Sequence, residues 1–596
     1  MNARQAPRGS GDRGDTTLIA GTAVVASVVL WAWASLSIAG RLSSGEWPDV
    51  SLQAAAESLV RVRSHLSNPW AALPVGLRTS TGRPPDAWLV YGASLTVVVL
   101  VAAGFAAARK FRGRSPSRGS SARTRGAGWA TASDTIGLRI SRRKGRNRLV
   151  LGRVRDLAPR RPLVATEARH SVLVLGPTQS GKTSGLAIPA ILDWDGPVIA
   201  TSVKDDLARA TLPARSARGP VWVFDPTSGS GLGRLARWSP LSVCGDWAAS
   251  QKMAAWLVEA TPARSGLADA AFWYAAASKQ LAPLLLAAAG GAFTMADVVR
   301  WTNSSDLTEP GAVLHALGEF DAALALSACN NRDERIRSSV STTLETVLAP
   351  FEDPGVASST SGHDIDLDTV IGTHSTLYLC GPSHEQSRVQ GLFAALVSAA
   401  IASATSRVAA LGRPLDPPLL VVLDEAANIA PVRDLDTIAS TSAGLGVQLV
   451  TVCQDLSQLS GRYGQDRART IVNNHRAKLL LSGVSDLSTL DLISGLAGEH
   501  AVREHTFTLD QRDGRRTRSS AIAFRRLAPA DELRRVPPGE AVLVYGHLPP
   551  VRLRLRPWFK DRHLAAVARG GIPAQRGGGL RALLGATRGG SPGILG

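Results

Sequence analysis

A phosphate-binding loop pattern constrains the fold of this chain more than any other feature. The pattern G-x-x-x-x-G-K-[ST] is matched at every fixed position by Gly176, Pro177, Thr178, Gln179, Ser180, Gly181, Lys182 and Thr183. An apolar run over 171–175 precedes the pattern, and a helix is expected behind it over 184–192. Because such a loop joins a buried strand to a helix, the chain is predicted to contain an α/β domain built around it.

The loop predicts binding of ATP together with Mg²⁺. Its glycines let backbone N–H groups surround the phosphates, Lys182 reaches the β and γ oxygens, and Thr183 offers its hydroxyl to Mg²⁺. The helix that follows points its positive N-terminal end at the same anion. The predicted nucleotide contacts are Gly176, Pro177, Thr178, Gln179, Ser180, Gly181, Lys182, Thr183 and Ser184.

The second half of the nucleotide site is predicted where the apolar run 419–423 ends in Asp424 and Glu425. Ligands of parallel sheets collect at the carboxyl ends of the strands, so burying this run brings both acids to the phosphate loop. Asp424 is expected to hold Mg²⁺ with Thr183. Glu425 is expected to polarise the attacking water as general base.

A third polar strand end is Gln454, which follows the apolar run 447–452. One hypothesis is that this glutamine senses the γ-phosphate or orients the attacking water. The alternative is that it caps the next helix. Under the first hypothesis the chain is an ATP hydrolase whose predicted catalytic residues are Lys182, Asp424, Glu425 and Gln454.

Short β-rich apolar runs recur after residue 170, and helical patterns such as 390–408 separate several of them. The runs span 171–175, 197–201, 220–224, 375–380, 419–423, 447–452, 478–481 and 541–545. Near-continuous apolar strands that alternate with helices indicate an α/β fold with a mostly parallel sheet covered on both faces. Between 245 and 350 the sequence is rich in Ala and Leu at helical spacing, which predicts an all-α insertion.

The nucleotide-binding domain is therefore expected over 129–244 and 351–560, interrupted by the insertion domain at 245–350. Gly and Arg are frequent over 561–596, which is predicted to be a disordered tail. Ser, Arg and Gly dominate 112–128, and this composition predicts a basic linker.

Two long apolar stretches, 16–40 and 87–108, precede the linker. Each is long enough to cross a hydrocarbon core about 30 Å thick as a helix. Arginines before the first stretch and Lys and Arg after the second indicate that both flanks stay in the cytoplasm. The sequence therefore predicts a two-pass membrane hairpin over 1–111, with both termini and the nucleotide-binding domain in the cytoplasm. Between the spans, 52–66 is either an amphipathic helix or a packed loop.

The formal net charge is +19, and much of the excess lies near the linker. The cluster over 109–125 begins at the membrane exit and is expected to contact anionic lipid. Between 139 and 161 the basic residues either contact nucleic acid or form a solvated face. Nearer the C-terminus, Arg552, Arg554 and Arg556 alternate with leucines, which predicts one solvated strand face.

Besides the phosphate loop, the chain carries several short motifs in a fixed order. They are Phe224-Asp225-Pro226, Trp238-Ser239-Pro240-Leu241, Phe272-Trp273, Asp424-Glu425-Ala426-Ala427-Asn428 and Gln454. Together with the apolar spans and the all-α insertion, this order resembles the type IV coupling proteins of conjugation and type IV secretion, the TraG/TraD family.

The resemblance implies a RecA-like P-loop NTPase domain with an all-α insertion domain and two N-terminal transmembrane helices. Such a protein assembles as a homo-hexamer at the bacterial inner (plasma) membrane. It uses ATP hydrolysis to pass single-stranded DNA, with its attached relaxase, to the components of a type IV secretion channel. The resemblance carries the catalytic roles over to Lys182, Asp424, Glu425 and Gln454.

One position departs from the family pattern. Members commonly place an arginine between the Walker B acids and the glutamine as a trans-acting finger, but no arginine lies between Arg433 and Gln454. An arginine finger contributes about 10³ to 10⁵ in rate. Either hydrolysis is slow here, or another arginine reaches the neighbouring site; the candidates are Arg332, Arg335, Arg337 and Arg462.

Two other functions fit the same sequence. In the first, the chain is a docking receptor in which ATP binding mainly stabilises the assembly, an alternative motivated by the missing arginine. In the second, it is a double-stranded DNA translocase of chromosome segregation, which shares the motor fold and the membrane anchor. No winged-helix pattern near the C-terminus favours the second.

Overall fold

The computed structural model describes residues 14–45, 47–73, 85–112, 127–140, 147–156, 162–203, 205–261, 270–382, 384–509 and 516–570. The chain divides into two compact units, Met1–Ala122 and Arg123–Gly596. Most of the predicted linker and the residues after 570 lie outside the described residues.

The N-terminal unit is helical. Helices α1 (Gly14–Ser44) and α4 (Ala87–Arg112) cover the two predicted membrane spans. Between them, α2 (Leu52–Arg61) begins at Ser51, whose hydroxyl accepts a hydrogen bond from the Ala54 N–H at 3.2 Å. Of the two alternatives for 52–66, the helix therefore forms. A small apolar cluster of α1, α2 and α4 residues around Trp70 joins these helices.

Membrane crossing by α1 and α4 stays a prediction. Among the described residues, one helix is long and apolar enough by composition to span a membrane, α15 (Gln386–Leu411). In its most apolar window, 61% of the residues are buried inside the protein. This degree of burial is typical of a core helix, so the packing described below accounts for the apolar composition of α15.

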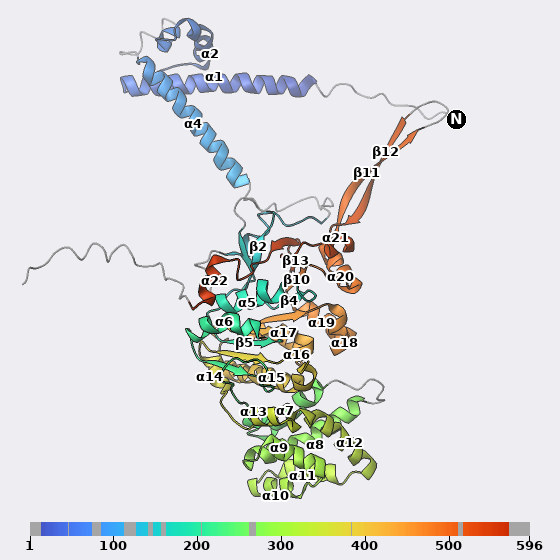
Figure 1. Cartoon of the computed structure of the whole chain (residues 1–596). Coiled ribbons are helices and arrows are strands. Elements are labelled where there is room, and N and C mark those ends of the chain that lie inside the picture. The colour runs from blue at the N-terminus through green and yellow to red at the C-terminus, as the bar shows by residue number, and fades with distance from the viewer. Residues whose placement is uncertain are drawn as a thin grey trace, which may run out of the picture. The chain divides into compact units, whose positions relative to one another are not determined.

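A mixed sheet of twelve strands organises the C-terminal unit (Figure 1). Its centre is parallel, in the order β10-β4-β9-β8-β5-β7-β6. These strands are β4 (Val172–Leu175), β5 (Val198–Ser202), β6 (Val221–Phe224), β7 (Thr376–Cys380), β8 (Leu419–Leu423), β9 (Val447–Cys453) and β10 (Ala477–Leu481). All of them come from predicted runs, because strands buried on both faces are apolar at almost every position.

Beyond β10 the sheet continues antiparallel in the order β13-β14-β2-β3-β1. These strands are β13 (Glu540–Tyr545), β14 (Val551–Arg554), β2 (Val150–Val154), β3 (Leu163–Ala165) and β1 (Arg139–Ile140). Seven of the eight predicted runs therefore form the parallel part of the sheet, and the run 541–545 is antiparallel. A two-stranded ribbon, β11 (Glu499–Leu509) with β12 (Arg516–Arg526), was not foreseen, because polar residues interrupt both sequences and leave no continuous apolar run.

Helices cover both faces of the sheet. On one face, Val172 and Val174 share a core with residues of α5 (Ile188–Asp193), α6 (Asp206–Ser216) and α22 (Arg562–Ala568). On the other face, Leu173 and Leu175 share a core with α15 and α17 (Leu435–Leu445). The α/β prediction is thus confirmed. The predicted disordered tail begins too early, since Leu564 and Val567 of α22 are buried in the first core.

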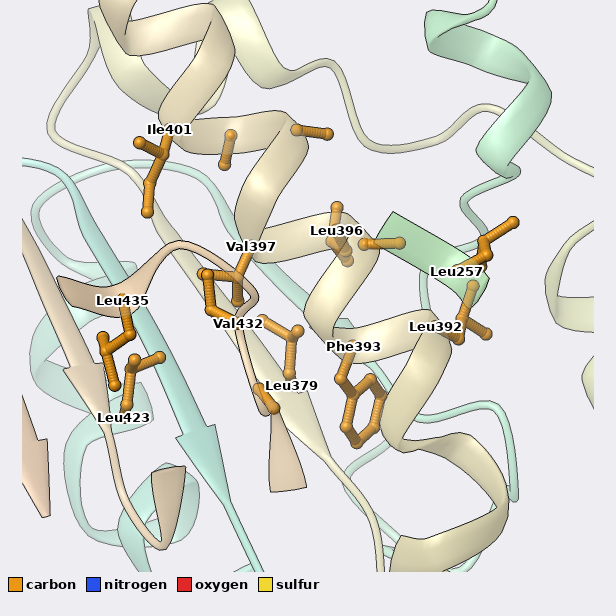
Figure 2. Close-up of a cluster of buried hydrophobic side chains, with 14 of the residues drawn as sticks. Leu257, Leu379, Leu392, Phe393, Leu396, Val397, Ile401, Leu423, Val432 and Leu435 are labelled. Atoms are coloured by element: carbon orange, nitrogen blue, oxygen red, sulfur yellow. The ribbon is translucent and has the colours of Figure 1, made fainter. Parts of the chain in front are cut away.

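Helix α15 joins the sheet to the helical stretch (Figure 2). Its side chains Phe393 and Val397 meet Leu379 of β7, while Leu392 lies beside Leu257 of α7 (Trp247–Ala260). All of these side chains are at most 2% exposed. The apolar part of the helix is stable here because residues 392–401 are buried on every side.

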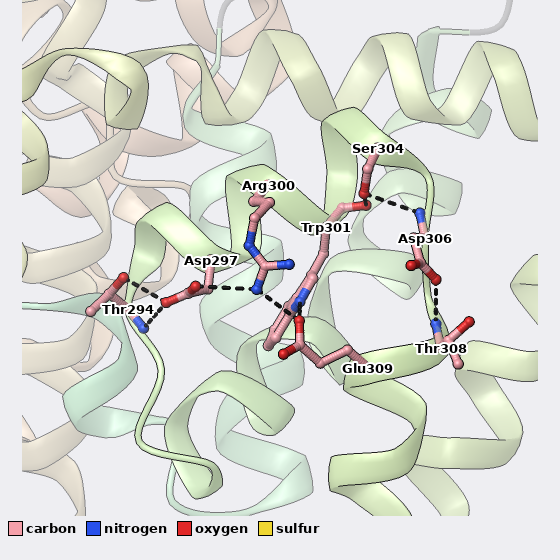
Figure 3. A network of polar contacts seen from close by, with 8 residues as sticks. All are labelled: Thr294, Asp297, Arg300, Trp301, Ser304, Asp306, Thr308 and Glu309. Atoms are coloured by element: carbon pink, nitrogen blue, oxygen red, sulfur yellow. Dashed lines mark hydrogen bonds and ion pairs between the residues drawn. The ribbon is translucent and has the colours of Figure 1, made fainter.

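Between β6 and β7, at the place predicted for an all-α insertion, the described elements are helices, apart from one isolated bridge of Trp238 with His363. The main ones are α7, α8 (Ala270–Gly290), α9 (Met295–Ser304), α10 (Thr308–Leu317), α11 (Phe320–Asn330) and α12 (Glu334–Leu348). Polar contacts fix the turn between α9 and α10 (Figure 3). Thr294 and Asp297 form a capping box at the start of α9, and Arg300 reaches Glu309 of α10 at 2.7 Å.

The expected solvated face at 552–556 is only partly correct. Arg552 stacks its guanidinium 4.0 Å above the Trp129 ring. Arg556 is only 5% exposed and forms ion pairs with Asp193 at 2.8 Å and Asp561 at 3.2 Å. The alternation with leucine hides this role because β14 ends at Arg554 and the chain changes direction after it.

A buried histidine makes the stability of the sheet depend on pH. The Nδ1 of His475 lies 2.7 Å from the Ile471 carbonyl, which can only accept, so Nδ1 carries the proton. Its Nε2, 2.9 Å from Oγ1 of Thr451 on β9, therefore accepts a hydrogen bond. Burial is the main cause that lowers the pKa of His475 from 6.5 to about 4.

We expect the wild type to lose about 3 kcal/mol more stability than a His475→Gln variant as the pH falls from 6.5 to 4. The unfolded chain binds this proton first, so the contribution is complete above 6.5 and is lost on the way down to 4. Urea unfolding at a series of pH values measures it. His384→Gln, at an exposed position, is the control. Parallel pH profiles of wild type and His475→Gln would contradict the assignment.

Candidate nucleotide-binding site

The phosphate loop follows β4 directly and has the backbone that its glycines predict. Gln179 and Gly181 adopt positive φ values of 64° and 88°. A Cβ atom on Gly176 would lie 2.6 Å from the Ser180 Oγ and 3.0 Å from the Leu481 Cβ. Glycine is therefore required at 176 by space and favoured at 181 by conformation.

The helix behind the loop starts differently from the prediction of a regular helix over 184–192. Residues Thr183–Ala187 form a π-helical turn, and α5 follows from Ile188. Pro189 explains the wider turn, because it has no N–H to donate to the Gly185 carbonyl that a regular α-helix would offer it. The loop Ser180 and Lys182 lie in the segment that leads into this turn.

The strand order brings the two acids to the loop. Strand β8 lies two places from β4, with β9 between them, so the carboxyl ends of the three strands share one edge. The Thr183 hydroxyl donates a hydrogen bond to Asp424 Oδ2 at 2.8 Å. The Lys182 Nζ lies 3.9 Å from Glu425 Oε1. Segments 241 residues apart in the chain therefore meet in one crevice.

The chemistry of these side chains suits a phosphate and a divalent cation. Lys182 Nζ, Ser180 Oγ and Asp424 Oδ1 are buried and make no hydrogen bond within the described residues. A buried polar atom without a partner is costly, and such atoms at a phosphate loop fit phosphate oxygens and Mg²⁺. Burial is the main cause that raises the pKa of Asp424 to about 6, against the hydrogen bond from Thr183 and the charge of Lys182.

Two features of the site were missed from the sequence. Glu425 has a left-handed backbone, with φ of 59° and ψ of 49°, which a non-glycine residue seldom adopts. Such strain persists where the surroundings hold it, and functional sites are a common place for it. The Thr201 hydroxyl, at the end of β5, donates to the Asp424 backbone carbonyl at 3.2 Å. Its only signal in the sequence is a threonine at a strand end.

Gln454 lies at the same edge of the sheet. The preceding residue, Cys453, accepts a hydrogen bond from the Gly176 N–H at 3.1 Å, so the end of β9 touches the start of the loop. The next helix, α18 (Leu456–Tyr463), is capped by Asp455, whose side chain accepts from the Gln458 N–H at 2.8 Å. Helix capping therefore does not explain Gln454.

The arginines considered as fingers lie on two elements. Arg462 of α18 is mostly buried, and its guanidinium donates to the backbone carbonyls of Glu259 and Ala260. Arg335 and Arg337 are exposed on α12, and Arg332 precedes that helix. None of these four has a described contact with the residues of the phosphate loop.

Comparison with known proteins assigns the family. A family model described as type IV secretory system conjugative DNA transfer matches residues 128–570. The chain belongs to this family of coupling proteins. Among curated relatives, it is 26% identical over 462 residues to the conjugal transfer protein TraG of Escherichia coli, covering 68% of this chain and 70% of the relative. It is 25% identical over 420 residues to protein VirD4 of Agrobacterium fabrum, covering 67% and 60%.

Solved structures of a coupling protein share the fold. The bacterial conjugative coupling protein TrwB matches with a TM-score of 0.52 at 19% identity, covering 65% of this chain and 84% of TrwB. TrwB in complex with ADP and Mg²⁺ matches with a TM-score of 0.50 at 18% identity, covering 70% and 97%. The mixed α/β unit of this family member is therefore built like TrwB.

Proposed function

We propose that this coupling protein is a membrane-anchored ATPase. In this proposal it receives single-stranded DNA with a covalently attached relaxase, presents it to a type IV secretion channel, and drives its transfer. The observation that carries the proposal is the 2.8 Å contact of Thr183 with Asp424, beside Lys182 and Glu425 at 3.9 Å. This crevice lies within the matched region 128–570 of a conjugative DNA transfer family.

Each residue of the crevice has a role that its position supports. Residues 176–184 hold the phosphates through backbone N–H groups, and the Lys182 ammonium, which makes no hydrogen bond within the described residues, neutralises the terminal phosphate oxygens. Thr183 and Asp424 would hold Mg²⁺, which would supply Lewis-acid polarisation of the phosphate. Glu425 takes a proton from the attacking water, and Gln454 orients that water. The TrwB complex with ADP and Mg²⁺ supports the choice of ligands.

The membrane part of the proposal rests on the N-terminal unit. Helices α1 and α4 leave large apolar side chains exposed to the surroundings, among them Leu30, Trp31, Trp33, Trp88, Leu95 and Val99. An exposed apolar surface of this kind suits lipid rather than water. The proposal places these helices across the inner membrane, the C-terminal unit in the cytoplasm, and six copies of the chain in a ring around the substrate.

The test is hydrolysis by the full chain in detergent. We expect ATP hydrolysis that requires Mg²⁺ and rises when single-stranded DNA is added, because a translocating motor couples turnover to its substrate. Phosphate release, measured with and without an oligonucleotide, checks this. Absence of hydrolysis in a sample that binds ATP would contradict the motor.

A docking receptor is the second candidate, favoured by the stretch without arginine between Arg433 and Gln454. In that function ATP binding stabilises the assembly and another ATPase supplies the work. The two candidates separate in a conjugation assay with Glu425→Gln. DNA transfer at the wild-type rate would support the receptor, and loss of transfer would support the motor.

A further inference from the structure

A pocket lies between the helical stretch and the segments that follow Glu425 and Gln454. Its volume is about 870 Å³, which falls within the range of ligand sites, roughly 300 to 1,000 Å³. Helices α7 and α8 supply one wall. The opposite wall includes Arg433 and Arg462. They follow Glu425 and Gln454, respectively, along the chain. Helix α11 (Phe320–Asn330) completes the lining of the pocket.

The lining of this pocket is strongly basic. Lys279, Arg433, Arg462 and Arg467 contribute four positive charges, against the single carboxylate of Glu259. Arg433 pairs with Glu259 at 2.6 Å, and Arg467 pairs with Asp436 at 2.9 Å. The remaining two cations form no ion pair within the described part of the chain. Lys279 is exposed, so its ammonium is available to a ligand.

Arg462 is the cation of this lining that is held without an acidic partner within the described residues. Its side chain is largely buried, and its described partners are two neutral carbonyls at the C-terminal end of α7. Burial is the main cause that lowers its pKa. A buried cation is stabilised by an anion, and within the described residues no acid side chain pairs with this one. The hydroxyl of the next residue, Tyr463, is also buried and has no hydrogen-bond partner among the residues that the structure describes.

Two aromatic side chains in the lining indicate which class of ligand fits the pocket. Trp247 and Tyr274 are half-buried in the pocket wall, beside the cations. Basic side chains that track phosphates, interleaved with aromatic faces on which bases stack, are the pattern that binds single strands of nucleic acid. A free inorganic anion would need the charges but would make no use of the aromatic rings.

We propose that this pocket binds a segment of single-stranded nucleic acid, with Lys279 and Arg462 on its phosphates and Trp247 and Tyr274 against its bases. The inference deepens the proposed function, on which it rests, by naming where the strand is held. The two chain segments that follow Glu425 and Gln454 carry Arg433 and Arg462, respectively. Both arginines contact the same end of α7, at Glu259 and Ala260. Occupancy of the pocket therefore acts on both segments that carry the proposed catalytic residues.

The experiment compares two lysines of the full-length protein in detergent. Lys279 of α8 lines the pocket, whereas Lys252 of α7 is also exposed but does not line it. The probe is a fluorescein-labelled oligo-dT of about 16 nucleotides, titrated at several KCl concentrations by fluorescence anisotropy. Lys279→Ala is expected to weaken binding about 5-fold at low salt and to reduce the slope of log K against log salt by about 0.7. Lys252→Ala is expected to change neither.

Each alternative outcome decides the proposal. Equal effects of the two variants, or none from either, would overturn the pocket as the site of the strand. Equally tight competition by the mononucleotide dTMP would assign the pocket to a small anion and overturn the strand. Binding of the fluorescent ATP analogue mant-ATP, measured in the same samples, reports the proposed nucleotide site separately. If it fails while the Lys279 effect remains, the ATPase proposal falls and the pocket stands.

Discussion

Replacing Glu425 by glutamine is expected to lower kcat for ATP hydrolysis by about 10² to 10⁴-fold while leaving ATP affinity almost unchanged. Glutamine keeps the size of the side chain and a carbonyl oxygen near Lys182, but it cannot accept the proton of the attacking water. The Lys182 ammonium, 3.9 Å from the Glu425 carboxylate, also loses a negative neighbour, which favours rather than weakens phosphate binding. The loss should therefore appear in turnover and not in binding.

A matched control is available in Glu540 on β13. Its carboxylate is 20% exposed and pairs with Arg155 at 2.8 Å, while Glu425 is 17% exposed and faces Lys182. Glu540→Gln removes the same charge from a comparable ion pair away from the crevice and should leave kcat within about two-fold. Steady-state hydrolysis and mant-ATP titration measure the two quantities. A Glu425→Gln variant that hydrolyses at the wild-type rate would show that Glu425 is not the base.

Replacing Arg215 by methionine is expected to destabilise the C-terminal unit by about 3 to 5 kcal/mol. Arg215, on α6, is fully buried. Its guanidinium donates to the Trp194 carbonyl at 2.9 Å, the Gly196 carbonyl at 2.6 Å and the Thr376 hydroxyl at 2.7 Å. Methionine fills the space but leaves these buried acceptors without donors, and each such acceptor costs about 1 to 3 kcal/mol.

The destabilisation of Arg215→Met should come from lost hydrogen bonds rather than lost charge. Burial lowers the pKa of Arg215 to about 10, so the cation itself is disfavoured there and the carbonyls offset the cost. The apparent urea midpoint of the full chain measures the change. Arg335→Met, at an exposed position on α12, is the control and should shift the midpoint little. An unchanged urea midpoint for Arg215→Met would contradict this prediction and would mean that water replaces the guanidinium at these carbonyls.

The central strands and the loop were predictable because their signals are local. A strand buried on both faces is apolar along most of its length, and β4 and β8 are apolar at every position. The glycine at 176 is required by an atom only four residues away, Ser180 Oγ. Even the acids at the end of β8 could be placed at the crevice, since parallel strands share a carboxyl edge.

The antiparallel edge, the ribbon of β11 and β12 and the pairing of Arg556 could not be predicted in the same way. The sequences of these elements are short, polar or alternating. Whether their side chains are buried depends on partners far along the chain. Arg556 meets Asp193 across 363 residues, and no local pattern distinguishes it from the neighbouring Arg554.

The sequence by itself determined the phosphate loop, the strands that flank it and the identity of the residues assigned to the nucleotide. These follow from rules that act within a few residues: backbone freedom at glycine, apolar periodicity and strand ends. Only the tertiary structure decided which other distant groups meet, namely Arg556 with Asp193, and Arg433 and Arg462 at the end of α7. The physical reason is that burial of the whole core sets the strand order and the helix packing. Side chains far apart in the chain come close only because this packing brings their elements together.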